Sequence, residues 1–498
     1  MVTKHKLPQG YHKYASLSQV QDKVLRKSTL VFDVEQALLK SSSMFPYFML
    51  VAFEAGGLLR ALILLVTYPM IRLLGEEMML KAMVFLCFFG IKAETFRLGM
   101  NCLPKLFLEN VGEEGFEMVM KFGKKVAISR LPRVMVEGYL REYLGIEHII
   151  GSELLEFGGY YIGLVKSQQE VLPKGFVANM EHHVVGIGGE STSFNKWPFR
   201  YCKDIYLMSK EDKKWTSLPK DKYPKPLIFH DGRLAFEPTP LATLIMFIWL
   251  PFGIILSLTR ILVGTLLPYK VSTPVLAFTG LTYISSNNPP HILTTNSKPG
   301  KSKGVIFVCN HKIVLDPVYL SLTLQTRLSA VTYSISKLTA TISLLVKTLN
   351  LTRDKAKDAV IMQNALSQGD LVVCPEGTTC REPYLLRFSP LFAEISDDII
   401  PIAVEAKFSM FYGTTATGMK ALDPFIVLMN PKPFYYLKFL DKLPKNRTCK
   451  GGGVSRLEVA NYVQAEIGKA LGYKCTQLTR KDKYAVLAGN DGLVVTSK

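Results

Sequence analysis

The stretch "VCNHKIVLDPVYLS" at residues 308–321 decides the fold of the carboxy-terminal half of this chain. It begins at the end of "GVIFVC", a continuous apolar run rich in β-branched residues, which is typical of a strand buried on both faces. The runs "LVVCPEG" and "DIIPIAVEA" repeat the pattern, and helical segments separate the three runs. From Gly304 onward the sequence therefore predicts an α/β domain.

Two side chains in this stretch could act together. His311 follows the predicted strand, and Asp316 comes soon afterwards, directly before Pro317. A carboxylate beside an imidazole fixes its tautomer and stabilises the imidazolium, so the pair could remove a hydroxyl proton. No serine or cysteine nucleophile is needed if the substrate's own hydroxyl attacks. The structural alternative is that Asp316 serves only as a helix N-cap, with proline at the first helical position.

Cations and a tight turn lie near the ends of the other predicted strands. The stretch "CPEGTTCRE" at residues 374–382 leaves its strand through a Pro-Glu-Gly turn, where backbone N–H groups and Arg381 could receive an anion. Arg353 lies in a turn just ahead of a predicted helix, and Lys337 follows the apolar segment "AVTYSIS". Several cations in these places would suit a phosphate group.

The length, charge and cysteine content of the chain limit the number of domains and the kinds of partner. A chain of 498 residues predicts two or three domains. Lys and Arg outnumber Asp and Glu by 60 to 41, and the formal charge of +19 favours anionic partners such as acidic lipids or phosphorylated substrates. A nucleic-acid partner is disfavoured because no recognised module is visible and the basic residues are dispersed. The eight cysteines have no metal-ligand spacing, which favours reduced thiols.

Two apolar stretches are long enough to cross a bilayer, which takes about 20 residues. Residues 44–75 are interrupted by Glu54, Arg60 and the pair Gly56-Gly57, so an amphipathic helical hairpin or a buried cap is as good an interpretation as a span. Residues 240–269 carry a single charge, Arg260, and are divided by Pro251. One kinked transmembrane helix and two shorter helices dipping into one leaflet fit this second stretch equally well.

Four blocks in the same order resemble the glycerolipid acyltransferase family. They are the Asn-His-x-x-x-x-Asp block at Asn310, His311 and Asp316, a basic block at Arg353, the Pro-Glu-Gly-Thr block at residues 375–378, and the apolar block "IIPIAV" at residues 399–404. The strings "PEGTTCREPYLLRFS" and "FPYFMLVAFEAGG" resemble the land-plant glycerol-3-phosphate acyltransferases, and this similarity covers nearly the whole chain. The family's third block usually continues with arginine, whereas this chain has Thr379 there and Arg381 two residues later.

The resemblance implies transfer of a fatty acyl group from acyl-CoA to a hydroxyl of glycerol-3-phosphate, sn-2 by the plant resemblance, to give lysophosphatidic acid. His311 would be the general base and Asp316 its orienting partner. The implied substrate-binding residues are Glu376, Gly377 and Thr378 for the glycerol backbone, and Arg353, Arg381 and Lys337 for the phosphate. No metal or other cofactor is expected, because a thioester is already activated. Acylation of lysophosphatidic acid is the alternative within the family.

The amino-terminal region resembles haloacid-dehalogenase-type phosphatases, whose first block is Asp-x-Asp-Gly-Thr after an apolar strand. The stretch "LVFDVEQALL" keeps Asp33 but has Glu35 at the second acidic position, and "VAISRLPR" offers Ser129 for the second block. In "VVGIGGESTS", Gly189 and Ser193 stand where magnesium-binding carboxylates are expected. We therefore expect a phosphatase-like fold without phosphatase activity. The alternative is a bifunctional enzyme that yields 2-monoacylglycerol.

The third phosphatase block normally supplies a lysine, for which Lys166 and Lys174 are the candidates. The expected organisation is a basic arm (1–27), a haloacid-dehalogenase-like Rossmannoid domain (28–215), a linker with a membrane-associated helical segment (216–285), an acyltransferase α/β domain (286–475) and a tail (476–498). The resemblance implies attachment to a lipid bilayer, at the endoplasmic reticulum with the active site facing the cytosol, or alternatively at a mitochondrial membrane. The sequence leaves the oligomeric state open.

Overall fold

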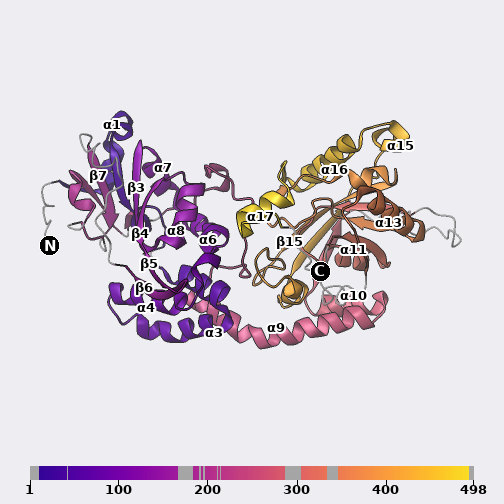
Figure 1. The fold of residues 1–498 in the computed structure, drawn as a ribbon, viewed down its shortest axis with the longest axis horizontal. Helices are drawn as coiled ribbons and strands as arrows, with labels where there is room; N and C mark the ends of the chain where they lie inside the picture. Colours follow the sequence, from indigo (N-terminus) through magenta and orange to yellow (C-terminus); the bar gives the residue numbers. More distant parts are fainter. Residues whose placement is uncertain are drawn as a thin grey trace. The chain divides into compact units, whose positions relative to one another are not determined.

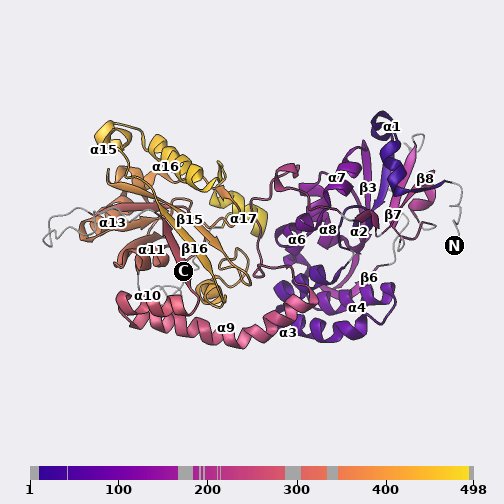
Figure 2. The same cartoon turned by 180° about the vertical axis from the view of Figure 1, so that it is seen from behind.

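The computed structural model describes residues 10–41, 43–166, 183–189, 192–194, 197–209, 211–213, 215–286, 304–333 and 346–492. The chain divides into two compact units (Figures 1 and 2). Unit 1 comprises Met1–His230 and Glu237–Thr243, and unit 2 comprises Asp231–Phe236 and Leu244–Lys498. The predicted linker (216–285) therefore belongs partly to each unit, since its residues up to His230 and from Glu237 to Thr243 belong to unit 1 and the others to unit 2.

Unit 1 is built on a six-stranded sheet in which all neighbouring strands are parallel. The strand order is β1 (Tyr11–Lys13), β8 (Asp204–Met208), β7 (Val184–Gly189), β2 (Thr29–Asp33), β3 (Lys124–Pro132) and β4 (His148–Ser152). A separate antiparallel hairpin joins β5 (Leu154–Phe157) to β6 (Tyr160–Val165). Every residue of β2 is buried, as the apolar run "TLVFD" predicts for a central strand.

The helices of unit 1 are α1 (Asp22–Lys27), α2 (Val34–Ala37), α3 (Phe45–Ile71), α4 (Glu76–Phe88), α5 (Leu98–Asn101), α6 (Leu103–Asn110), α7 (Glu113–Met120) and α8 (Arg133–Gly138). Helix α3 is interrupted at Gly57, whose φ of 77° and ψ of −178° form a backbone conformation that glycine adopts readily and other residues rarely adopt. The half before this kink is largely buried, whereas the half after it exposes Leu59, Val66 and Met70. Helix α3 packs against α4, and Arg60, after the kink, donates to Cys87 O of α4 at 2.8 Å. Residues 44–75 thus form one kinked helix instead of a hairpin within this stretch.

Unit 2 contains a seven-stranded sheet. The order is β12 (Val346–Asn350), β11 (Leu328–Thr332), β13 (Leu371–Val373), β10 (Ile306–Cys309), β15 (Ile399–Lys407), β16 (Phe434–Phe439) and β9 (Thr282–Ser286). All neighbours are parallel except β15 and β16, which are antiparallel. The short strands β14 (Tyr384–Leu385) and β17 (Lys474–Cys475) pair separately. The three predicted strands of this domain are therefore β10, β13 and β15, which lie side by side.

Helices cover both faces of this sheet (Figure 1). They are α10 (Tyr269–Phe278), α11 (Asp316–Leu324), α13 (Lys355–Gln368), α14 (Asp423–Leu428), α15 (Cys449–Gly452), α16 (Arg456–Leu471) and α17 (Arg480–Ala488). Strand β10 is buried on both sides, because Phe307 packs in the apolar cluster of α11 and Ile306 in that of α13 and α16. The stretch 476–498, expected as a tail, contains α17, a helix of this unit.

Helix α9 (Pro240–Leu266) has one polar, protein-bound side and one apolar, exposed side. On the bound side, Trp249 Nε1 donates to Met429 O at 2.9 Å and Ser257 Oγ donates to Phe425 O at 2.8 Å. The guanidinium of Arg260 is buried and donates to carbonyl oxygens of residues 428, 430 and 431. The exposed side carries Leu244, Ile248, Phe252, Ile255, Leu258, Leu262 and Leu266.

Candidate active site

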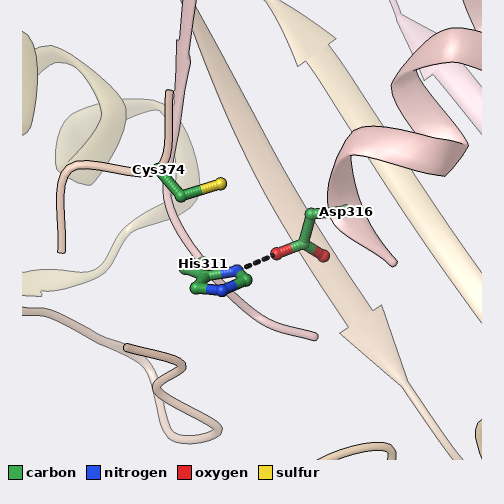
Figure 3. A group of neighbouring side chains, drawn as sticks. All are labelled: His311, Asp316 and Cys374. Atoms are coloured by element: carbon green, nitrogen blue, oxygen red, sulfur yellow. Dashed lines mark hydrogen bonds and ion pairs between the residues drawn. The ribbon is translucent and has the colours of Figure 1, made fainter. Parts of the chain in front are cut away.

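The candidate catalytic pair lies at the carboxyl ends of the central strands of unit 2. His311 follows β10, and Asp316 is the first residue of α11. His311 Nδ1 lies 2.8 Å from Asp316 Oδ2 (Figure 3). The Asp316 side chain is fully buried, whereas the His311 side chain is 20% exposed. A buried carboxylate thus holds one nitrogen of a partly accessible imidazole, the arrangement that acid–base chemistry requires.

Asp316 is not the helix N-cap that the structural alternative assumed. The N-cap is Leu315, and no side chain caps the helix there. The Asp316 carboxylate instead accepts the backbone N–H of Lys312 at 2.7 Å and that of Ile313 at 3.1 Å. Its other oxygen accepts the Tyr435 hydroxyl at 2.5 Å. The carboxylate therefore points back towards the loop that carries His311, and it is fixed by partners from β16 as well as from that loop.

The Pro-Glu-Gly turn holds the backbone of His311 in place. Glu376 Oε1 accepts the His311 backbone N–H at 2.7 Å, and Glu376 Oε2 accepts the Leu386 backbone N–H at 2.8 Å. The backbone N–H of Cys380 donates to His311 O at 2.9 Å. Gly377 has a φ of 66°, a left-handed conformation that favours glycine in this turn. Glu376 is therefore a positioning residue, and Gly377 permits the turn that places it.

Burial and the neighbours of His311 act on the pKa of its imidazole in opposite directions. Burial disfavours the imidazolium, but the neighbouring Cys374 sulfur and Asp316 raise the pKa of His311 well above its ordinary value. The contact with Cys309 and burial raise the pKa of the Cys374 thiol, so this thiol is neutral near neutral pH. Asp316 contacts the imidazole directly, with Oδ2 2.8 Å from His311 Nδ1. Burial also raises the pKa of Glu376, to about 7, although two backbone N–H groups oppose the shift.

Cys374 is a neighbour of the pair that the sequence did not indicate as a site residue. Its sulfur lies 3.4 Å from Cys309 Sγ. The same sulfur, a ring nitrogen of His311 and a carboxylate oxygen of Asp316 all lie within 4.8 Å of one another (Figure 3). Such a group could in principle hold a metal ion. The Asp316 oxygens, however, already accept three N–H or O–H donors, from Lys312, Ile313 and Tyr435, besides facing the imidazole. The rule that reactive groups collect at strand ends could have identified Cys374, which directly follows β13.

A cavity of about 950 Å³ opens beside His311. Part of its lining is apolar and includes Val314, Val318, Val331, Leu351, Met362 and Phe392. The rest includes polar and basic groups: the turn residues 376–379 and Arg353, Arg387, Lys420, Arg480 and Lys483. A lining that combines apolar side chains with several cations suits an amphiphile whose polar end is anionic.

Some of the predicted substrate-binding residues line the cavity in the structure, and others do not. Four of them line the cavity: Glu376, Gly377, Thr378 and Arg353. Arg381 is absent from its lining, and its guanidinium instead donates to Gly232 O at 2.9 Å and to Thr414 O.

The same guanidinium lies 3.7 Å from Asp231 and packs on the ring of Tyr412. The guanidinium of Arg381 is therefore bound within the fold, and its expected phosphate-binding role stays a prediction. Lys337 lies outside the described residues.

Unit 1 brings together most of the predicted phosphatase-like residues. Asp33, Glu35, Ser129 and Gly189 meet at the carboxyl ends of β2, β3 and β7. The Ser129 hydroxyl donates to the Glu35 carboxylate. Burial and the nearby Asp33 raise the pKa of Glu35 to about 7. In the described part of the chain, no group of three metal-ligating side chains forms at Asp33.

Two features of this region differ from expectation. Ser193 is exposed, and Thr192 instead donates its hydroxyl proton to Asp33 Oδ2 at 2.8 Å. Among the described residues, Lys213 contacts this region: its amine donates to Glu35 O at 2.9 Å, and burial lowers its pKa to about 8. Lys166 is exposed, and Lys174 lies outside the described residues. Lys213 follows the last strand of the sheet, so the order of the phosphatase blocks gave no signal for it.

Comparisons with known proteins match both parts of the chain. Residues 29–208 match the family described as "Glycerol-3-phosphate acyltransferase RAM2-like, HAD-like domain", and residues 281–405 match the family described as "Acyltransferase". The expected haloacid-dehalogenase-like and acyltransferase domains are thereby confirmed. Among solved structures, the 1-acyl-sn-glycerophosphate acyltransferase of Thermotoga maritima aligns at 16% identity over 47% of this chain and 94% of that one. Its TM-score of 0.28 is too low to carry an argument.

Two plant proteins are similar over nearly their whole length. The chain is 50% identical to the probable glycerol-3-phosphate acyltransferase 2 of Arabidopsis thaliana, over 98% of this chain and 94% of that protein. It is 41% identical to the glycerol-3-phosphate acyltransferase RAM2 of Petunia hybrida, over 93% of this chain and 98% of that protein. This chain is therefore an acyltransferase enzyme and belongs to the plant glycerol-3-phosphate acyltransferase family.

Proposed function

We propose that the protein transfers a fatty acyl group from acyl-CoA to the sn-2 hydroxyl of glycerol-3-phosphate, with His311 as general base. The observation that carries this mechanism is the 2.8 Å contact of His311 Nδ1 with the buried Asp316. Because Nδ1 is engaged, Nε2 is the ring nitrogen that receives the proton. A base of this kind, at the edge of a cavity with an apolar wall, suits an attack by a polar acceptor on an acyl chain.

The proposed reaction moves one proton and exchanges one bond. Nε2 takes the proton of the glycerol hydroxyl while its oxygen forms a bond to the thioester carbonyl carbon. The carbon–sulfur bond then breaks, and the imidazolium returns the proton to the coenzyme A sulfur. Asp316 stabilises the imidazolium between these two steps. The thioester is already activated, so the proposal includes no metal or other cofactor.

Unit 1 contributes no phosphatase step in this proposal, and the product keeps its phosphate. The proposal rests on the use of the two acidic groups within the fold. Asp33 accepts the Gln36 backbone N–H at 3.0 Å and the Thr192 hydroxyl, and Glu35 accepts the Ser129 hydroxyl. Magnesium needs several hard oxygen ligands in an octahedral array, and these carboxylates are already bound by protein donors.

We also propose attachment to a membrane, at the endoplasmic reticulum with the active site facing the cytosol. Helices α3 and α9 are long and apolar enough to cross a bilayer, which gives weak support for membrane association. The contacts of α9 favour a helix that lies in the membrane surface. A span would carry the loop at residues 425–431, which α9 binds through Trp249 and Arg260, into the hydrocarbon region.

One assay tests the proposed function. The purified protein is incubated with glycerol-3-phosphate and a panel of acyl-CoAs, with and without a chelator, and the regioisomer and free phosphate are measured. We expect 2-acyl lysophosphatidic acid, no free phosphate and no effect of the chelator. His311→Ala should abolish transfer while circular dichroism and the melting temperature stay those of the wild type. Preferential acylation of lysophosphatidic acid, or full activity of His311→Ala, would refute the proposal.

A further inference from the structure

The basic side of the cavity contains a buried lysine from the far end of the chain. Lys483 lies on α17 and lines the cavity, and only 8% of the residue is exposed. We propose that Lys483 binds a phosphate group of a substrate at the Pro-Glu-Gly-Thr turn, and so adds a substrate-binding residue to the reaction proposed above, on which this inference rests.

Lys483 is held against the turn by neutral oxygens. Its Nζ donates to Thr379 O at 2.6 Å, to Thr379 Oγ1 at 3.1 Å and to Thr378 Oγ1 at 3.4 Å. Thr379 directly precedes Cys380, whose backbone N–H donates to the His311 carbonyl oxygen. The ammonium therefore lies at the segment that packs against the proposed base.

The charge of Lys483 has no ion-pair partner among the described residues: no carboxylate oxygen lies within 4.0 Å of its amine. Asp231 acts on Lys483 electrostatically, but its carboxylate already lies 3.7 Å from the Arg381 guanidinium. Burial and the positive charge of Arg381 lower the pKa of Lys483 to about 8. A buried ammonium bound only by neutral oxygens is costly unless an anion joins it. A substrate phosphate would supply that anion.

A second cation on the same helix supports this assignment. Arg480 lies one turn before Lys483 and also lines the cavity. Lys481, between them, is exposed and does not line it. Helix α17 therefore presents two cations to the cavity and a third to solvent. The alternative is that Lys483 only fastens α17 to the turn, a role that its hydrogen bonds would also fill.

Two sources of phosphate are available in the proposed reaction. One is glycerol-3-phosphate, and the other is the coenzyme A portion of the acyl donor. The substrate whose KM rises in a Lys483 variant is the one whose phosphate the lysine binds. We would measure kcat and KM for both substrates in Lys483→Met, which replaces the ammonium with an apolar group of similar length. Lys481→Met is the matched control, because it removes the same charge from the exposed face of the same helix.

We expect Lys483→Met to raise the KM for glycerol-3-phosphate by about 10- to 100-fold, the effect of losing a hydrogen bond to a charged group, while kcat changes little. A rise in the KM for acyl-CoA instead would assign the lysine to the coenzyme A phosphates. Lys481→Met should leave both constants within about twofold of the wild type. A purely structural lysine would change the melting temperature or kcat but neither KM.

Lys483→Gln keeps a hydrogen-bond donor for the Thr379 carbonyl oxygen and removes only the charge, so it serves if Lys483→Met fails to fold. Unchanged KM values for both substrates in either folded variant, measured beside an active wild type, would overturn the assignment of Lys483 alone. An inactive wild type would instead refute the proposed function, and this assignment with it.

Discussion

Replacing Asp316 by asparagine tests the proposed mechanism most directly. The carboxylate faces His311 Nδ1 and accepts two backbone N–H groups and the Tyr435 hydroxyl, so nearly all of its acceptor capacity is used. Asparagine has one acceptor oxygen and one NH₂ group, and whichever way it turns, the NH₂ meets a donor. The imidazole then loses the partner that sets its tautomer.

The magnitudes follow from the contact that is lost. A hydrogen bond to a charged group contributes about 1.5–3 kcal/mol, and 1.36 kcal/mol corresponds to one pKa unit, so the pKa of His311 should fall by roughly one to two units. Transfer requires the neutral imidazole, so the rate of the wild type rises as the pH increases through the pKa of His311. In Asp316→Asn this rise should occur at lower pH. The wrong tautomer should lower kcat by about 10³- to 10⁴-fold, as in other imidazole–carboxylate pairs.

The assay is a pH–rate profile of kcat/KM, followed by release of the coenzyme A thiol, for the wild type and Asp316→Asn. Asp441→Asn, an exposed aspartate of the same unit, is the matched control and should follow the wild-type profile. Melting temperatures confirm that the variants are folded. The reasoning would be refuted by a folded Asp316→Asn enzyme that keeps more than a tenth of the wild-type kcat with an unmoved acidic limb.

Three further substitutions have defined outcomes. Glu376→Gln leaves one of two backbone N–H groups without its acceptor, so it should lower the free energy of unfolding by about 1–3 kcal/mol in chemical denaturation and also lower kcat, because the backbone of His311 loses its anchor. Wild-type stability with a wild-type kcat would contradict this role. Arg260→Met leaves several carbonyl oxygens without a donor and should lower the free energy of unfolding by about 2–4 kcal/mol. The melting temperature in detergent should therefore fall, and an unchanged melting temperature would exclude this role. Asp33→Asn should leave acyl transfer and free phosphate at wild-type levels in the combined product assay; a loss of phosphate release would show that unit 1 is an active phosphatase.

The proposed catalytic pair was accessible from the sequence because its signals are local. A buried parallel strand shows itself as a continuous apolar run, and the residues that follow it must lie at the carboxyl edge of the sheet. His311, Asp316 and the Pro-Glu-Gly turn follow such runs, so their meeting could be predicted. The resemblance to a known family added the reaction, which the residue pattern alone did not specify.

The charges were harder to place because their roles depend on distant partners. Arg381 stands two residues after the position where the family's block usually has arginine, and Asp231 and the Thr414 carbonyl oxygen, from other parts of the chain, contact its guanidinium within the fold. Lys483 stands in a stretch that looked like a tail. No periodicity or motif connects it to the turn more than a hundred residues earlier that it contacts.

The sequence by itself determined the α/β domain from Gly304 onward, the strands that carry the site and the order of the blocks, because apolar runs and turn residues act over short distances. The fold of the amino-terminal domain was implied by the resemblance to a known family. Only the tertiary structure decided that Asp316 faces the imidazole instead of capping its helix, that α3 bends at Gly57, and that α17 supplies cations to the cavity. These outcomes depend on which surfaces pack together, and packing brings into contact groups whose separation along the chain carries no local signal.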